Sequence, residues 1–287
     1  MRNHSSIQRR RGFTLIELLV GMVIFAIVGA LFTKLLTVQG RFFDKQGMGN
    51  AARNVSRASL NRVVSDFRMI EATGGVLAAS PTSITIRVPF ALGVVCGTNN
   101  NSTAVSLLPV DSVMYDADGF YGYAWRSATT GAYTYVENPA AQQKNMGQNL
   151  CNSVNITTLT NGRTTRITPM MTGSSLGTPV FLYRRLRYEF KASTAVVGKT
   201  GLYRTIMFPD GSERSEELVA PFASTAKYRF FVVGDNTTAH DAPPADLTQM
   251  RGIELHLDGI SETMVPGSTS AESAPFTTAV FFKNRAN

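Results

Sequence analysis

An apolar run near the amino terminus limits what this chain can fold into. Residues 13–32 contain a single charged side chain, Glu17, and ten Leu, Ile, Val or Phe residues lie between Leu18 and Thr33. About twenty residues is the length at which a helix spans a bilayer. The apolar side chains favour insertion by roughly 3–6 kcal/mol, whereas one carboxylate costs at most roughly 3 kcal/mol. The run therefore predicts a membrane-spanning helix over residues 13–34.

Basic residues lie on one side of this run. Residues 9–11 are all arginine and fewer cations follow the run, so we expect the amino end to stay in the cytoplasm and the rest to be exported. A secretory signal peptide has the same basic start and apolar core, and its cleavage site would fall near residues 28–30. A single-pass anchor without processing is the other alternative. Neither explains a glutamate near the start of the run.

Glu17 is explained if the chain is cut after Gly12. Cleavage there creates a new α-amine on Phe13, which is positively charged near neutral pH. Glu17 follows one helical turn later on the same face, and a charge at membrane depth needs a partner. We expect the amine of one subunit to pair with the Glu17 carboxylate of its neighbour, which would set the register of a helical assembly.

The segment from Arg11 to Val20, RGFTLIELLV, resembles the leader of type IV prepilins and type II secretion pseudopilins. The resemblance implies that residues 1–12 are a leader peptide, and that a prepilin peptidase cuts after Gly12 and methylates the amine of Phe13. It also implies a precursor in the bacterial inner membrane with a cytoplasmic amino end. The mature chain would then join other pilins in a filament at the cell surface.

Composition and charge add a weaker constraint. Of the 287 residues, 44% are hydrophobic and 17% are charged, which allows a sizeable folded core. The formal net charge of +8 falls to +4 without residues 1–12, which hold four arginines and no acidic residue. A mildly basic chain of this size does not by itself indicate nucleic acid as a partner.

The two cysteines, Cys96 and Cys151, are too few for a zinc site. In an exported domain we expect them to form a disulfide bond, which would stabilise the fold by at most roughly 4 kcal/mol. Two unpaired buried thiols are the alternative.

Helical periodicity continues beyond the membrane. Apolar residues recur at spacings of three and four between Val55 and Ile70, while the arginines of this stretch fall mostly elsewhere. This pattern predicts an amphipathic continuation of the helix over residues 35–74, laid on a domain and ended by the glycines at 74 and 75. Three glycines predict a bend or a loosened turn in its middle, namely Gly40, Gly47 and Gly49.

Beyond residue 75 the apolar period becomes that of β-strands. The predicted strands are Ser83 to Val88, Val180 to Phe190, Gly201 to Phe208, Lys227 to Val233, Gly252 to Leu257 and Phe276 to Lys283. A turn is predicted at Pro209-Asp210-Gly211. One long helix followed by a mainly antiparallel sheet is an α+β arrangement, with an extracytoplasmic β-rich domain over residues 75–287.

Residues 93–177 differ from the rest of this domain. They hold few charges, many Asn, Ser, Thr and Gly residues, and both cysteines, and we interpret them as an inserted lobe. The lobe contains five clustered aromatic residues, namely Tyr115, Phe120, Tyr121, Tyr123 and Trp125. Packing of the lobe's own core is favoured over a recognition surface.

The last third of the chain carries a second resemblance. Segments beginning at Leu186, Gly201, Tyr228, Met250 and Thr277 resemble the carboxyl half of PilW-type minor pilins. Those chains end in a strand closed by an Arg-Asn or similar pair. Lys283-Asn284 takes that place here.

Several short motifs suggest chemistry that their context does not support. Residues 173–177 match the G-x-S-x-G pattern of hydrolases but lack the preceding strand and the following helix. Residues 47–52 match a loose dinucleotide pattern within a helix rather than after a strand. The remaining candidates are His240 and His256, which have no acidic or cysteine cluster at metal-ligand spacing, and Asp116 to Gly119, a calcium-loop fragment. We therefore expect no catalytic residue, cofactor or metal.

Two groups of arginines would suit DNA, and solvated charge or acidic neighbours on adjacent subunits explain them better: Arg184, Arg185 and Arg187 on one predicted strand, and Arg53 and Arg57 on the helix. The functional hypothesis is a minor subunit of a type IV pilus, in its tip or priming complex. A type II secretion pseudopilin is the alternative within the family. An anchored extracytoplasmic enzyme or binding protein is the alternative outside it.

Overall fold

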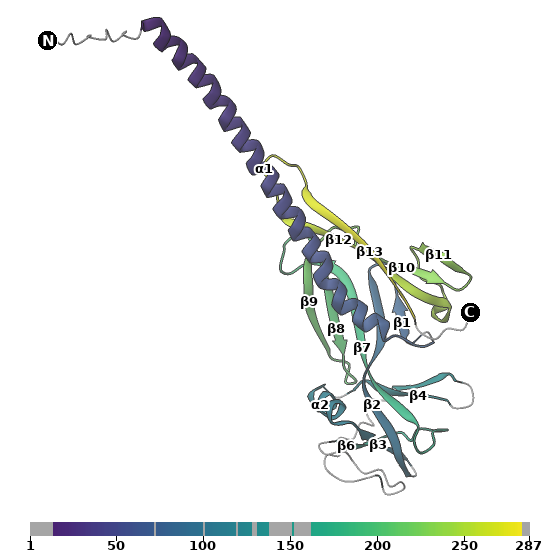
Figure 1. The fold of residues 1–287 in the computed structure, drawn as a ribbon. Coiled ribbons are helices and arrows are strands. Elements are labelled where there is room, and N and C mark those ends of the chain that lie inside the picture. Colours follow the sequence, from purple (N-terminus) through teal and green to yellow (C-terminus); the bar gives the residue numbers. More distant parts are fainter. Residues whose placement is uncertain are drawn as a thin grey trace, which may run out of the picture.

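The structure is a computed structural model that describes residues 14–71, 73–99, 101–118, 120–127, 131–137, 151 and 162–282. It consists of one long helix and a large antiparallel sheet, so the fold is α+β and pilin-like, as predicted. Figure 1 shows the helix leaving the sheet at one end, with its amino-terminal half far from every strand. The helices and strands are α1 (Leu15–Arg68), β1 (Val76–Ala79), β2 (Ser83–Asn99), β3 (Ser102–Leu107), α2 (Pro109–Asp118), β4 (Gly122–Arg126), β5 (Tyr133–Glu137), β6 (Arg163–Ile167), β7 (Pro179–Ala192), β8 (Thr200–Met207), β9 (Glu213–Phe222), β10 (Lys227–Val232), β11 (Asp235–His240), the 3-10 helix η2 (Leu247–Gln249), β12 (Met250–Met264) and β13 (Ala271–Phe281).

Helix α1 is continuous over 54 residues, about 81 Å at 1.5 Å per residue. The predicted bend or loosened turn is wrong, because the helix passes through Gly40, Gly47 and Gly49 without interruption. No atom lies within 4 Å of a Cβ built at Gly40 or Gly47, so nothing packs there to deflect the helix. The cost of about 1 kcal/mol for each glycine is spread over a long, otherwise favourable helix.

The carboxyl end of α1 also differs from the prediction, since the helix ends at Arg68 rather than at the glycine pair. The amides of Met69 and Ile70 donate to the carbonyls three residues earlier, at 3.1 and 3.2 Å, which tightens the last turn. The tightened turn directs Ile70 into the core, where it is 1% exposed.

The sheet runs in the order β11-β10-β12-β9-β8-β7-β2-β3-β6, with β13 beside β12 and β1 beside β2. Strands β2 and β7 are paired along their length, and each changes its other neighbour halfway. At one end β7 pairs with β8 and β2 with β1; at the other, β7 pairs with β4 and β2 with β3. These two strands therefore join the sheet region under α1 to a second region farther from the amino terminus (Figure 1).

Two separate apolar clusters follow from this division. The first contains the buried side of α1, with Val63 and Phe67, packed on β1, β2, β7 to β10, β12 and β13. The second is built from β2 to β4, α2, β6 and β7, and includes four of the five aromatic residues predicted to pack the lobe, namely Tyr115, Phe120, Tyr123 and Trp125. These four side chains are all buried. Cys96 and Cys151 form the predicted disulfide bond beside this second cluster.

The six predicted strands correspond to β2, β7, β8, β10, β12 and β13, and the predicted turn at Gly211 connects β8 to β9. The last residue of the final predicted strand, Lys283, lies outside the described residues. Strand β2 is longer than predicted because it continues past Pro89, where the register with β7 shifts. A proline is compatible with a strand at such an irregularity.

Helix α1 comes very close to the sheet at Gly259 of β12. A Cβ at this position would lie 2.3 Å from the carbonyl oxygen of Ala52 and 2.6 Å from the Ser56 hydroxyl oxygen, so only glycine fits. The Ser56 hydroxyl accepts from the amide of Gly259 at 3.1 Å and donates to the carbonyl of Ala274 at 3.3 Å. One helix side chain thus bridges β12 and β13, which fixes the height at which α1 leaves the sheet.

Candidate assembly surface

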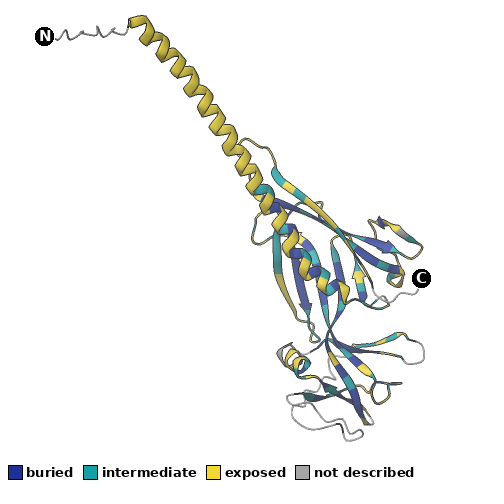
Figure 2. Ribbon diagram, viewed as in Figure 1, coloured by how far each residue is buried: buried dark blue, intermediate teal, exposed yellow. Residues whose placement is uncertain are grey.

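The amino-terminal half of α1 has no packing partner in the described part of the chain. Every residue from Thr14 to Gly47 is exposed, and the first buried residue of the helix is Ala52. Figure 2 shows this half as a continuous exposed rod beyond the sheet. The eighteen large apolar residues from Leu15 to Phe43 are each at least 50% exposed. By length and composition, α1 is able to cross a membrane.

Covering this exposed apolar surface contributes a large free energy. Fully burying one such side chain contributes about 1.5–3 kcal/mol, so covering all of them contributes tens of kcal/mol. That exceeds the net stability of a typical domain, about 5–15 kcal/mol. The helix therefore needs an apolar environment, such as lipid or other apolar helices.

Glu17, the one charged residue from Leu15 to Thr33, is held by a capping box. Its carboxylate accepts from the amide and the hydroxyl of Thr14, at 2.9 and 3.1 Å. The Thr14 hydroxyl in turn accepts from the amide of Glu17 at 3.3 Å. The carboxylate thereby satisfies helix donors that would otherwise lack a partner. Gly12 and Phe13, the predicted processing residues, lie outside the described residues.

Below the exposed half, a polar cluster attaches α1 to the sheet. Asp66 of α1 accepts a 2.5 Å hydrogen bond from the Tyr188 hydroxyl and lies 3.6 Å from Nε of Arg204. The same guanidinium contacts Glu216 at 3.3 Å. Burial and the negative charge of Asp66 raise the pKa of Tyr188, so its hydroxyl stays protonated and keeps donating. We call Asp66, Tyr188 and Arg204 the helix lock.

The β12–β13 hairpin supports α1 farther toward its exposed half. Lys45 lies 3.9 Å from Glu272 at the start of β13. The guanidinium of Arg41 lies beside Gly267 in the hairpin turn. The hairpin therefore extends along α1 to the level at which the large apolar side chains begin.

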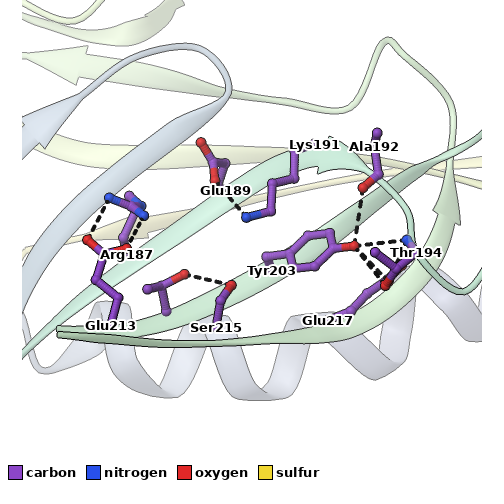
Figure 3. Close-up of polar contacts among 10 residues, drawn as sticks. Arg187, Glu189, Lys191, Ala192, Thr194, Tyr203, Glu213, Ser215 and Glu217 are labelled. Carbon is purple, nitrogen blue, oxygen red and sulfur yellow. Dashed lines mark hydrogen bonds and ion pairs between the residues drawn. The ribbon is translucent and has the colours of Figure 1, made fainter.

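The face of the sheet opposite α1 carries a polar belt across β7, β8 and β9 (Figure 3). Arg187 pairs with Glu213 at 2.6 Å, and the hydroxyls of Thr205 and Ser215 are 2.9 Å apart. At one end of the belt Glu217 accepts from the hydroxyls of Ser193, Thr194 and Tyr203 and from the amides of Thr194 and Ala195. These contacts attach the loop between β7 and β8 to β9.

The hydrogen bonds also determine the charge of Glu217. Burial alone would raise the pKa of this carboxyl, but the donors from Ser193, Thr194 and Tyr203 outweigh burial and lower the pKa to about 2. A carboxylate that stays ionised near neutral pH and accepts several hydrogen bonds is suited to a structural role rather than to proton transfer.

The short motifs set aside from the sequence lie in structural positions. Residues 173–177 form a loop between β6 and β7, followed by a strand, and residues 47–52 lie within α1. His240 contacts Asp235 at 3.3 Å, and His256 contacts the Thr277 hydroxyl at 3.1 Å. Within the ranges that the structure describes, no three His, Cys, Asp or Glu residues are grouped so as to hold a metal ion. Asp116 to Asp118 end α2, and Gly119 is not described.

The arginine cluster on β7 is engaged within the chain. Arg184 stacks over the ring of Phe90 at 4.4 Å, Arg185 donates to the Tyr121 hydroxyl at 3.1 Å, and Arg187 pairs with Glu213. Each of the three guanidinium groups therefore has a contact within the chain.

Comparison with known proteins gives one match. Residues 7–33 match the family model described as the prokaryotic N-terminal methylation motif, a range that includes Gly12, Phe13 and Glu17. No curated protein and no solved structure matched the chain. The motif occurs together with an exposed apolar helix on an antiparallel sheet. This combination supports the assignment of the chain to the type IV pilin and pseudopilin class, whose members are processed by a prepilin peptidase.

The helix lock predicts a specific loss of stability. Arg204 and Asp66 have side chains that are 6% and 13% exposed, so Arg204→Met leaves a mostly buried carboxylate without its cation. We expect the free energy of unfolding to fall by about 3–5 kcal/mol. Arg62→Met is the matched control, because Arg62 is 55% exposed and 4.0 Å from the same carboxylate, and it should cost at most about 0.5 kcal/mol. Thermal unfolding of the detergent-solubilised chain measures both, and equal losses would contradict the helix lock.

The Glu217 cluster predicts a pH dependence. Its pKa in the folded chain, about 2, lies below the unfolded value of about 4.3. The contribution of Glu217 to stability is therefore present above about pH 5 and is lost as the pH falls toward 2. The thermal midpoints of the wild type and Glu217→Gln should differ at pH 7 and converge over this window. The exposed Glu262→Gln is the control, and a constant difference between Glu217→Gln and the wild type would contradict the assignment.

Proposed function

We propose that this chain is a minor pilin of a type IV pilus, of the PilW type, and that it acts by assembly rather than catalysis. The observation that carries the proposal is the apolar surface of α1, which has no cover in the described chain and which begins within the matched methylation motif. Such a surface suits two successive environments, the inner membrane before assembly and a bundle of helices afterwards.

The proposed maturation removes residues 1–12. A prepilin peptidase cuts after Gly12 on the cytoplasmic side of the inner membrane and methylates the new amine of Phe13. The chain is held in the membrane by α1 until it is extracted into a filament at the cell surface, with the sheet domain outside the membrane throughout.

Glu17 determines how neighbouring subunits align during assembly. In the isolated chain the carboxylate is occupied by Thr14 in the capping box. During assembly it accepts the methylated amine of a neighbouring subunit, and it exchanges a short-range partner within its own helix for one across the interface. An ion pair in an apolar surrounding has strong geometric preferences, so it sets the vertical register between subunits.

The sheet domain determines which subunits become neighbours. It follows the orientation of α1 because the helix lock and the Ser56 bridge attach it rigidly to the helix. A place in the tip or priming complex is supported by the size of this domain, since the resemblance to minor pilins implies that shaft subunits are usually shorter.

A minor pseudopilin of a type II secretion system is the second candidate, because the methylation motif is common to both classes. Deletion of the chain separates them. Loss of surface pili with normal protein secretion supports the pilin, and loss of secretion supports the pseudopilin.

The pairing role of Glu17 is tested by two variants. Glu17→Ala should be processed normally but enter filaments at least about tenfold less well, because the neighbour's amine then has no counter-charge. Thr14→Ala removes the capping hydroxyl but keeps the carboxylate, and it should cost only the cap, about 1 kcal/mol of helix stability. Quantitative immunoblots of sheared filaments against membrane precursor measure incorporation. Equal incorporation by Glu17→Ala and wild type, or equal defects in both variants, would contradict the pairing.

A further inference from the structure

Strand β13 leaves one edge of the large sheet open. It is eleven residues long and pairs with β12 alone among the described strands. We propose that this edge is where an extended, acidic segment of an adjacent subunit adds as a further strand. The inference rests on the proposed filament function, since that function supplies the adjacent subunit.

The register identifies the free backbone groups. The amide of Phe282 donates to the carbonyl of Arg251 at 2.9 Å, toward β12. In an antiparallel ladder the direction alternates along the strand, so the backbone groups of Thr277, Ala279 and Phe281 point away from β12. All three residues are exposed. This spacing is the one that an added strand requires.

The edge lacks most of the features that normally prevent pairing. From Ala274 to Phe281 it contains no charged residue, and its composition, APFTTAVF, includes β-branched and aromatic side chains. Pro275, near the start of the strand, is the only residue in this stretch that cannot donate. An open, uncharged edge of this length in a secreted domain indicates a partner rather than a solvent boundary.

A groove lies beside the same edge. It is lined by Thr278 of β13 and by the part of α1 from Leu60 to Met69, and its volume is about 460 Å³. Leu60 and Val64 form its apolar floor, and Met69 is 49% exposed at its end. An added strand would place alternate side chains in this groove.

The charge of the helix flank specifies the chemistry of the partner. Arg57 and Arg68 are exposed on this part of α1, and Arg68 lines the groove. Within the described part of the chain neither of them has an ion pair, whereas Arg62 lies 4.0 Å from Asp66 on the side of the helix lock. The segment best suited to this site alternates apolar residues with Asp or Glu. The chain's own last five residues, from Lys283, hold two cations and no acidic side chain, so they do not match.

Site-specific photo-cross-linking tests the proposal in the full-length chain within cells that assemble filaments. A photo-reactive phenylalanine derivative at Met69 should cross-link to an acidic, extended segment of another filament subunit, identified by mass spectrometry. The same probe at Val197, which is 92% exposed on the β7–β8 loop, is the control position. A product at Val197 but not at Met69, or a product at Met69 that is a second copy of this chain, would overturn the proposal.

Two variants define the interaction. Ala279→Pro removes one outward amide and should lower the Met69 product about fivefold or more, whereas Ala279→Val keeps the amide and should retain it. Arg68→Glu reverses the charge at the groove and should lower the product, whereas Arg68→Lys should retain it. Because Arg68 is exposed, its variants remain informative if Ala279→Pro fails to fold.

Incorporation of the chain into filaments separates failure of this proposal from failure of the proposed function. If the wild-type chain enters filaments and neither Ala279→Pro nor Arg68→Glu changes the Met69 product, the strand proposal is wrong and the filament function stands. If the wild-type chain is absent from filaments, the proposed function is wrong.

Discussion

The apolar half of α1 is the constraint on which the rest of the structure depends. A helix whose large side chains from Leu15 to Phe43 are all exposed within the chain cannot remain in water, because the unfavourable hydration exceeds what a folded domain of this size can offset. Lipid is one environment that covers this surface. In the filament that we propose, other apolar helices cover it, and the carboxylate of Glu17 sets the register between them.

The other half of α1 fixes the position of the sheet domain relative to the exposed half of the helix. Small residues allow a close approach, since Ala52 and Ser56 pack against Gly259 where no Cβ could fit. The helix lock then fixes rotation through one carboxylate, one tyrosine and one arginine. A displacement of the helix along its axis is therefore transmitted to the whole sheet, including the open edge of β13.

Much of this architecture could be predicted from the sequence because it depends on local patterns. The apolar run, the change of period after residue 75 and the disulfide all follow from composition and spacing. The capping box was missed, although Thr14 and Glu17 have the required T-x-x-E spacing before an apolar run. The helix lock could not be found, because Asp66 and Arg204 are far apart in sequence and each alone looks like an ordinary surface charge.

The errors have physical causes. Glycines at 40, 47 and 49 suggested a bend, but local propensity alone does not break a helix that nothing pushes aside. Strand β9 is not predicted because residues 213–217 are all polar; Glu213, Ser215 and Glu217 face the polar belt, and Glu216 contacts Arg204 on the opposite face. The strand pattern predicts that β2 ends at Val88, whereas the register shift after Pro89 accommodates the proline.

The central claim is that the mature chain places a cationic amine and the Glu17 carboxylate together at the start of an apolar helix. The intact mass of the protein isolated from its native membrane and from filaments tests it most directly. The account predicts a chain that begins at Phe13 and carries one added methyl group. A chain that begins at Met1, or one that begins after Ala30 and lacks Glu17, would contradict it.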